Sequence, residues 1–318
     1  MPALLLALVP LIALAVDRWL GEPPARWHPV VWMGAWLQAC APHVAPQEAG
    51  PRSHARMLPF VAGAMAWCLG AAMVALLALA LQTALWRWLP AWSAVLVLGL
   101  LLKPLLAWRL LREEVQGVEA ALAQSTAAGR AQLARLVSRN VTPLSATEVR
   151  ESALESLAEN LNDSVVAPLF WFAVAGLPGA ALYRFANTAD AMWGYRGARD
   201  GRVWEWAGKW AAHADDALSW LPARITALLL ALAARRWPRG LRREAARTPS
   251  PNSGWPMAAM ALLLDVRLAK PGVYALHADG GAAAPSHVPH AIALAGRAAW
   301  AAGLLCAAAV FVRPGVLP

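Results

Sequence analysis

The chain has 318 residues, of which 59% are hydrophobic and 15% are charged, and its mean hydropathy is +0.45. Soluble domains usually carry roughly 25% charged residues, so this composition predicts an integral membrane protein and excludes an ordinary soluble domain. The net charge of +9 comes mainly from arginine, but no zinc finger, helix-turn-helix or aromatic-basic RNA motif accompanies it, so we expect basic loops beside membrane helices and no nucleic-acid partner.

Apolar segments that are long or nearly long enough to cross a bilayer occur in both halves of the chain. A helical span takes about 20 residues. The segments are Ala3 to Val16, Leu58 to Leu81, Trp88 to Leu106 and Ile292 to Val312. At least three spans follow. Strand patterning is absent, so we predict an all-α, polytopic protein with one membrane domain over residues 1–318.

Residues 109–163 are amphipathic and charged, and we expect them to form a helical insert on the cytoplasmic side. Ser145, followed three residues later by Glu148, is a capping-box helix start. Acidic residues then recur at four-residue spacing: Glu151, Glu155, Glu159 and Asp163. This spacing places them in one stripe along a helix. A solvated face is the alternative, but like charges destabilise a helix unless a cation compensates, so we interpret Glu159 and Asp163 as Mg²⁺ ligands.

Two further apolar segments, Val165 to Tyr183 and Leu221 to Ala234, are short or interrupted by Pro and Gly. One full crossing between Glu159 and Asp190 would separate these carboxylates by the bilayer. Either the segments dip or pack as buried helices, or the site lies within the bilayer plane and is lined by broken helices. The sequence favours neither, so the polar cavity is predicted to be intramembrane or membrane-proximal.

Residues 184–220 form the predicted catalytic segment, because ionisable residues between apolar segments are costly and usually functional. Candidate residues in and after it are Asn187, Asp190, Tyr195, Arg196, Asp215, Asp216 and Arg224. Paired acids with nearby arginines suit a metal-phosphate site. An internal salt-bridge network is the alternative. Residues 235–290 follow as a cytoplasmic basic loop and connection, since arginines are frequent from Arg235 to Arg247.

Five ordered blocks resemble the CobD/CbiB family of adenosylcobinamide-phosphate synthases, from near the N-terminus to about Tyr274. The blocks are Asp17 to Gly34, with GEP and HPV; ESLAENLNDSVVAPL at Glu155 to Leu169; NTADAMWGYR at Asn187 to Arg196; AHADDALSWLPAR at Ala212 to Arg224; and SGWPMAAMALLLDVRL at Ser253 to Leu268, preceded by Asn252. No single block would suffice, but five in order make a specific signal.

The resemblance implies a multi-pass enzyme of the cell inner membrane whose active face is cytoplasmic. Its implied reaction in cobalamin biosynthesis is a ligation: with ATP and Mg²⁺, it joins a propionate carboxyl of adenosylcobyric acid to (R)-1-amino-2-propanol or its O-phosphate. The product is adenosylcobinamide or its phosphate. The implied partners are this corrinoid, the amine, membrane lipid and other cobalamin-synthesis enzymes.

Under this hypothesis the carboxylates include the Mg²⁺ ligands and a base for the incoming ammonium. The catalytic candidates are Glu159, Asp163, Asp190, Asp215 and Asp216, with Glu159, Asp163 and Asp216 as the metal ligands. Arg196 and Arg224 would hold phosphates, and His28, Asn160, Asn187, Tyr195 and Asn252 would bind substrate. All these carboxylates are expected to converge, because a metal site needs its ligands within a few ångströms of one ion.

Two other classes of function compete with the enzyme. An ion-coupled transporter would also use buried acids and broken helices, but it should show an inverted repeat of hydrophobic segments, and none is visible. A non-catalytic scaffold for cobalamin enzymes leaves the polar pairs beside apolar segments without a purpose.

Overall fold

The computed structural model describes residues 2–50 and 55–312 and is almost entirely helical. The helices are α1 Pro2–Leu6, α2 Val9–Leu20, α3 Pro29–Val44, α4 Met57–Trp88, α5 Ala91–Leu102, α6 Trp108–Leu122, α7 Thr126–Leu133, α8 Ala146–Leu161, α9 Ala167–Trp193, α10 Lys209–Ala234, α11 Leu241–Ala245, α12 Gly254–Leu264 and α13 His287–Val312. The all-α prediction is confirmed. Residue 1, residues 51–54 and residues 313–318 of the predicted membrane domain lie outside the described residues.

Residues 2–50 and 55–312 contain two β-sheets, and each is a short antiparallel hairpin of two strands. β1 Ala198–Arg199 pairs with β2 Arg202–Val203, and β3 Leu268–Lys270 pairs with β4 Tyr274–Leu276. Strands of two or three residues are too short for an alternating apolar pattern to reveal them. The first hairpin connects α9 to α10, and the second connects α12 to α13. The fold class is therefore still all-α.

Five helical stretches are long and apolar enough to cross a membrane: Met57–Trp88, Ala91–Leu122, Ala146–Trp193, Lys209–Ala234 and His287–Val312. The prediction of at least three such segments is confirmed. The first apolar segment, Ala3 to Val16, is divided between α1 and α2 and is not among the five. α4 exposes large apolar side chains such as Met65, Leu69 and Leu76. A lipid environment accounts for this exposure, because water would make it unfavourable.

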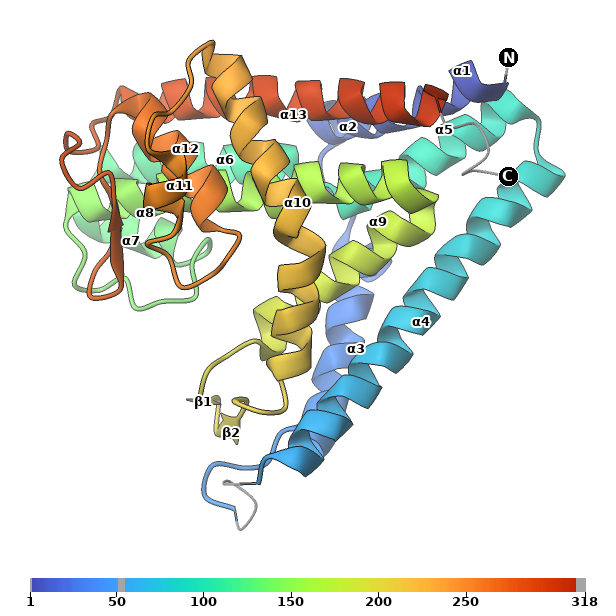
Figure 1. Ribbon diagram of the computed structural model, residues 1–318, viewed down its shortest axis with the longest axis horizontal. Helices are drawn as coiled ribbons and strands as arrows, with labels where there is room; N and C mark the ends of the chain where they lie inside the picture. The colour runs from blue at the N-terminus through green and yellow to red at the C-terminus, as the bar shows by residue number, and fades with distance from the viewer. Residues whose placement is uncertain (1, 51–54, 313–318) are drawn as a thin grey trace.

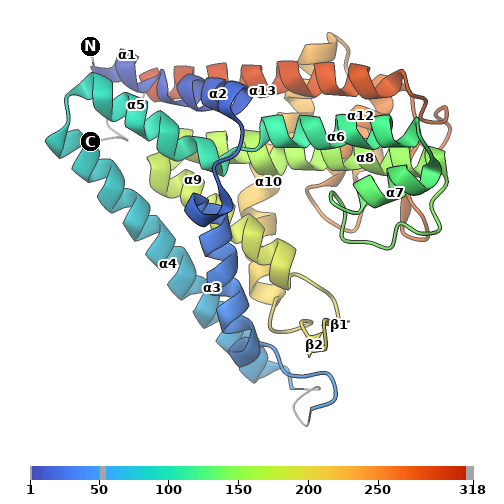
Figure 2. The ribbon, with the colours of Figure 1, turned by 180° about the vertical axis from the view of Figure 1, so that it is seen from behind.

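The helices form a layer and an arm (Figure 1). In the layer, α2 packs on α5 and α13, and α6 packs on α8 and α13. In the arm, α3, α4 and α10 pack around the second part of α9. Figure 2 shows the same division from behind. The predicted insert, residues 109–163, is helical as α6, α7 and α8, and α8 is buried within the layer. The side of the membrane on which this segment lies stays a prediction.

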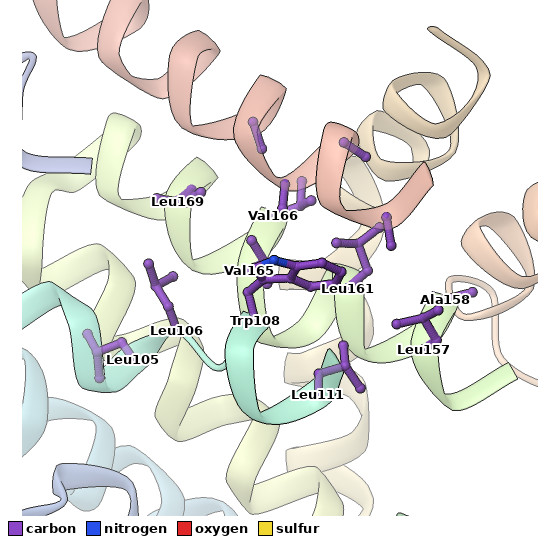
Figure 3. Packing of buried hydrophobic residues seen from close by; sticks show 14 of the residues in the cluster. Leu105, Leu106, Trp108, Leu111, Leu157, Ala158, Leu161, Val165, Val166 and Leu169 are labelled. Carbon is purple, nitrogen blue, oxygen red and sulfur yellow. The ribbon is translucent and has the colours of Figure 1, made fainter. Parts of the chain in front are cut away.

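A buried apolar cluster joins α6, α8 and the start of α9 (Figure 3). Trp108 of α6 lies among Leu157, Leu161 and Val165, and all four are almost fully buried. Each large side chain of this kind contributes roughly 1.5–3 kcal/mol by leaving water. The cluster therefore holds α8, which carries the acidic stripe, in a defined position.

α9 is broken in its middle and doubles back. Gly176 has φ +67° and Ala175 is also non-helical, and glycine adopts positive φ without the steric cost that a side chain adds. The helix resumes at Leu177, whose N–H donates to Oε1 of Gln82 at 2.8 Å. Gln82 comes from the apolar helix α4 and is buried. The segment from Val165 to Tyr183 is thus a bent pair of helices, and Asp190 returns toward Asp163.

Candidate active site

A polar cavity of about 390 Å³ lies where α8, α9 and α10 meet the loop before α12. Five acids line it: Glu159, Asp163, Asp190, Asp215 and Asp216. Its other lining residues are Gly194, Arg196, Ala212, Ser219, Pro249, Ser250, Asn252 and Ser253. We call it the carboxylate cavity. The structure brings together all five acids for which the sequence predicts a catalytic role, so they are neither scattered nor divided by a membrane span.

The acidic stripe of α8 divides into two parts. Glu151 lies 3.6 Å from Arg267, and Glu155 lies 2.8 Å from Arg139. The salt-bridge interpretation therefore describes these two residues. Glu159 and Asp163 point instead into the carboxylate cavity. A π-helical turn, Asn162–Val166, follows α8 and contains Asp163. Such turns change the direction of side chains within a helix and are frequent at functional sites.

Asp163 is held by Asn162 and Tyr183, which are in turn bonded to α10. It accepts a hydrogen bond from Nδ2 of Asn162 at 2.8 Å, and the Tyr183 hydroxyl lies 3.5 Å away. That hydroxyl also hydrogen-bonds Ser219 of α10 at 3.0 Å. Asn162 in turn accepts from the Thr226 hydroxyl at 3.1 Å. These side chains fix the π-helical turn against both α9 and α10.

Arg184 begins the predicted catalytic segment but is not among its individually predicted site residues, and the structure adds it to the site. Its Nη1 donates to the Asp163 carbonyl oxygen at 3.1 Å, to Oγ of Ser164 at 3.1 Å and to Oδ1 of Asn187 at 3.2 Å. Asn187 then donates to Asp215 at 3.5 Å. Arg184 stands three residues before Asn187 in an apolar run, and a cation in such a run was the available signal.

Asp216 is positioned by Asn252, which is buried and lines the cavity. Nδ2 of Asn252 donates to the carbonyl oxygen of Asp216 at 2.7 Å and lies 3.3 Å from its carboxylate. Oδ1 of Asn252 accepts from Arg224 at 3.2 Å. The guanidinium of Arg224 lies 4.2 Å from the ring centre of Trp220 and 4.7 Å from that of Trp255. Arg224 thus stands behind Asn252, outside the cavity lining, whereas Arg196 lines the cavity.

The remaining predicted substrate-binding residues are not among the lining residues. Asn160 donates to the Ser156 carbonyl at 3.0 Å, and the Tyr195 hydroxyl donates to the Ala191 carbonyl at 2.9 Å. His28 belongs to a separate ionic cluster at the start of α3.

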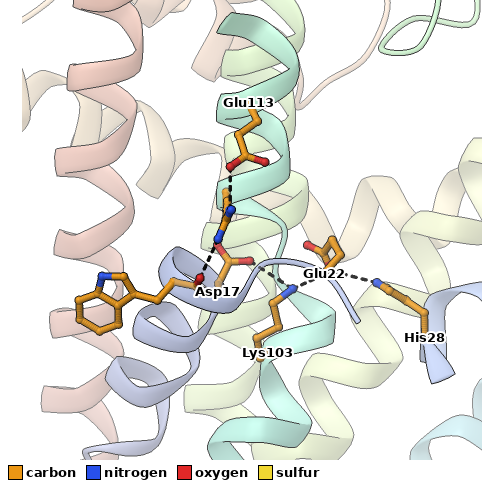
Figure 4. Close-up of polar contacts among 7 residues, drawn as sticks. Asp17, Glu22, His28, Lys103 and Glu113 are labelled. Atoms are coloured by element: carbon orange, nitrogen blue, oxygen red, sulfur yellow. Dashed lines mark hydrogen bonds and ion pairs between the residues drawn. The ribbon is translucent and has the colours of Figure 1, made fainter. Parts of the chain in front are cut away.

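Figure 4 shows this ionic cluster, which links His28, Glu22, Lys103 and Asp17. Glu22 lies 3.1 Å from His28 and 2.6 Å from Lys103, and Lys103 lies 3.4 Å from Asp17. Asp17 also accepts the Arg109 N–H at 2.8 Å. Burial opposes ionisation of Glu22, but hydrogen bonds and charge from His28 and Lys103 leave its pKa below the usual value. The cluster connects α2, the N-cap of α3, the 3-10 turn Lys103–Leu105 that follows α5, and the start of α6.

The five acids of the carboxylate cavity form no ion pair with any cation in residues 2–50 and 55–312. In the same ranges no group of three or more His, Cys, Asp or Glu side chains is close enough to hold a metal ion by itself. Oxygen donors of this kind suit Mg²⁺, which usually takes one or two carboxylates and completes its shell with water and substrate phosphates. The donor set fits a metal-nucleotide complex better than a protein-only metal site.

Comparison with known proteins gives one consistent result. The sequence model of the CobD/Cbib protein family matches residues 10–295. The cobalamin biosynthesis protein CobD of Chromobacterium violaceum is 39% identical, with 95% of this chain and 96% of that protein covered. The same-named protein of Rhodobacter capsulatus is 40% identical (83% and 82% covered), and the probable one of Methanothermobacter thermautotrophicus is 37% identical (84% and 85%). No solved structure matches the chain.

Proposed function

The chain belongs to the CobD/CbiB family, and on that premise we propose that it acts in cobalamin biosynthesis as an ATP-dependent amide ligase. It would join a propionate carboxyl of adenosylcobyric acid to aminopropanol or its O-phosphate at the inner membrane. The observation that carries this proposal is the carboxylate cavity, in which five acids share one space. Within the described part of the chain none of them forms an ion pair. The metal ion of a bound metal-nucleotide complex would offset this concentration of negative charge.

The chemistry requires activation of the acid before the amine attacks. A carboxylate is a poor acyl electrophile, so one of its oxygens first attacks a phosphorus of ATP, giving an acyl phosphate with release of ADP or an acyl adenylate with release of pyrophosphate. The amine then loses a proton, attacks the carbonyl carbon and displaces the phosphate or AMP. Both steps depend mainly on positioning and on neutralising phosphate charge.

The described side chains divide these tasks. One or two of the carboxylates of Glu159, Asp163 and Asp216 would hold the metal, with water and substrate phosphates as its other ligands. Asp190 or Asp215 would accept the proton of the incoming ammonium. Mg²⁺, when bound, neutralises phosphate charge. Arg196 lines the cavity and is suited to a phosphate oxygen. Arg184 bonds the backbone of Asp163 and the side chain of Asn187, and Asn187 bonds Asp215. These bonds would fix the positions of the two acids relative to each other.

The size of the cavity limits what enters it. A space of about 390 Å³ is near the lower end of small-molecule sites, which measure roughly 300–1,000 Å³. It accommodates the reacting propionate arm, the amine and the nucleotide phosphates, and the corrin ring would remain at its mouth. We therefore expect the ring to contribute mainly to binding and little to catalysis.

The test is a reconstituted assay in liposomes with adenosylcobyric acid, ATP, Mg²⁺ and each amine in turn, with products identified by mass. Amide product that forms only with ATP supports the proposal, and the amine that reacts faster identifies the acceptor. Uptake of the corrinoid without amide formation would contradict the proposal and favour a transporter.

A further inference from the structure

A groove lined by arginine and tryptophan lies beside the end of α10. It has a volume of about 710 Å³, and its walls include Trp237, Arg242, Arg243 and Trp255. A left-handed turn at Gly240, with φ +81°, starts α11 and sets its arginines beside Trp237. We call this feature the arginine–tryptophan groove. It shares no lining residue with the carboxylate cavity.

The segment that carries the groove is strongly basic. Six arginines of residues 235–247 are exposed: Arg235, Arg236, Arg239, Arg242, Arg243 and Arg247. The single acid of the segment is Glu244, which is buried and lies 3.5 Å from Arg243 and 3.1 Å from Arg247. One carboxylate cannot neutralise six guanidinium groups. The segment therefore presents a surface suited to an anion, and arginine binds phosphate oxygens in a bidentate manner.

The residues that precede the groove are apolar and exposed. Leu228 and Leu232 lie one turn apart on α10, and Leu232 is 61% exposed. Trp237 follows and is 62% exposed. Along the chain the exposed leucines are therefore followed by a segment in which exposed arginines flank Trp237. This passage from apolar to interfacial and basic side chains suits the path from acyl chain to headgroup, because Trp is enriched at membrane interfaces and Arg attracts anionic lipids.

We propose that the arginine–tryptophan groove binds the headgroup of an anionic phospholipid, with the phosphate on Arg242 and Arg243 and the acyl chains along Leu228 and Leu232. A free phosphate or a nucleotide would use the arginines but would leave the exposed leucines without a role. The proposal concerns a lipid site and does not depend on the ligase activity.

The experiment titrates the purified full chain in detergent with phosphatidylglycerol and with phosphatidylcholine of the same acyl chains, and counts bound lipids by native mass spectrometry. We expect tighter binding of phosphatidylglycerol. The R242Q/R243Q variant should lose this affinity by about 25-fold, since each arginine near an anionic surface contributes roughly five-fold. The control variant R26Q/R297Q removes the same charge at exposed sites on other elements and should bind as the parent does.

Gel filtration and thermal unfolding establish that both variants are folded. The proposal is overturned if the parent binds the two lipids equally, or if the control loses as much affinity as R242Q/R243Q. Displacement of phosphatidylglycerol by millimolar inorganic phosphate or ATP would also overturn it, because the groove would then be a site for free anions.

Discussion

Gln82 holds the break in α9, and Gln82→Leu tests whether this break positions the active site. The side chain is buried, and its Oε1 accepts the Leu177 N–H at 2.8 Å. The variant replaces the polar amide with an apolar side chain of similar volume and leaves the buried Leu177 N–H without a partner. An unsatisfied buried donor costs about 1–3 kcal/mol. A loss of this size lowers Tm by roughly 2–10 °C in a chain of this length.

The assay compares thermal unfolding of Gln82→Leu with that of Thr83→Val in the same detergent. Thr83 is the next residue of α4, is exposed, and its hydroxyl bonds only to carbonyl groups of its own helix. We expect Thr83→Val to unfold as the parent does. Gln82→Leu should also lose ligase activity below the unfolding temperature, because the second part of α9 carries Arg184 and Asp190. Unchanged Tm and turnover in Gln82→Leu would refute the reasoning.

Four further outcomes are expected. Asp216→Asn should lower amide formation about 100-fold or more while leaving the protein folded, since it removes charge without creating a cavity; near-normal turnover would move the metal site elsewhere. Arg184→Gln should cost about 1.5–3 kcal/mol and abolish activity, with partial recovery in Arg184→Lys, because a part-buried guanidinium that bonds three acceptors is lost; equal behaviour of the two variants would contradict this role. Arg224→Lys should lower kcat with little change in KM for ATP, since Arg224 positions Asn252 from outside the cavity; a rise in KM alone would instead indicate direct phosphate contact. A periplasmic reporter fused at Arg243 should be inactive, because short basic loops resist translocation, and an active fusion would reverse the predicted topology.

Much of the helical architecture follows from the sequence. Apolar length identifies α4 and α13, and the capping box places the start of α8: the Ser145 hydroxyl accepts the Glu148 N–H, and the Glu148 carboxylate accepts the Ser145 N–H. The convergence of Glu159, Asp190 and Asp216 also follows, because a shared ion requires it. Their catalytic and metal-binding roles stay predictions.

Other features depend on partners that are distant in the chain. Gly176 marks a possible interruption, but its sharp reversal is stabilised by Gln82, which comes from another helix. The acidic stripe looks uniform until Arg139 and Arg267 pair with two of its members. Arg224 resembles a phosphate ligand in sequence, yet two tryptophan rings enclose it. Local patterns do not specify such contacts, which arise only when the helices pack.

The transfer of oxygen from acid to phosphate tests the ligase claim most directly. Adenosylcobyric acid carrying ¹⁸O in the reacting propionate carboxyl is incubated with the reconstituted chain, ATP, Mg²⁺ and the amine. The account predicts one ¹⁸O atom in the released phosphate or AMP for each amide formed, because a carboxyl oxygen attacks phosphorus and leaves with it. Amide formation without ¹⁸O transfer, or ¹⁸O transfer that persists in Asp216→Asn at the parent rate, would contradict activation of the acid in the carboxylate cavity.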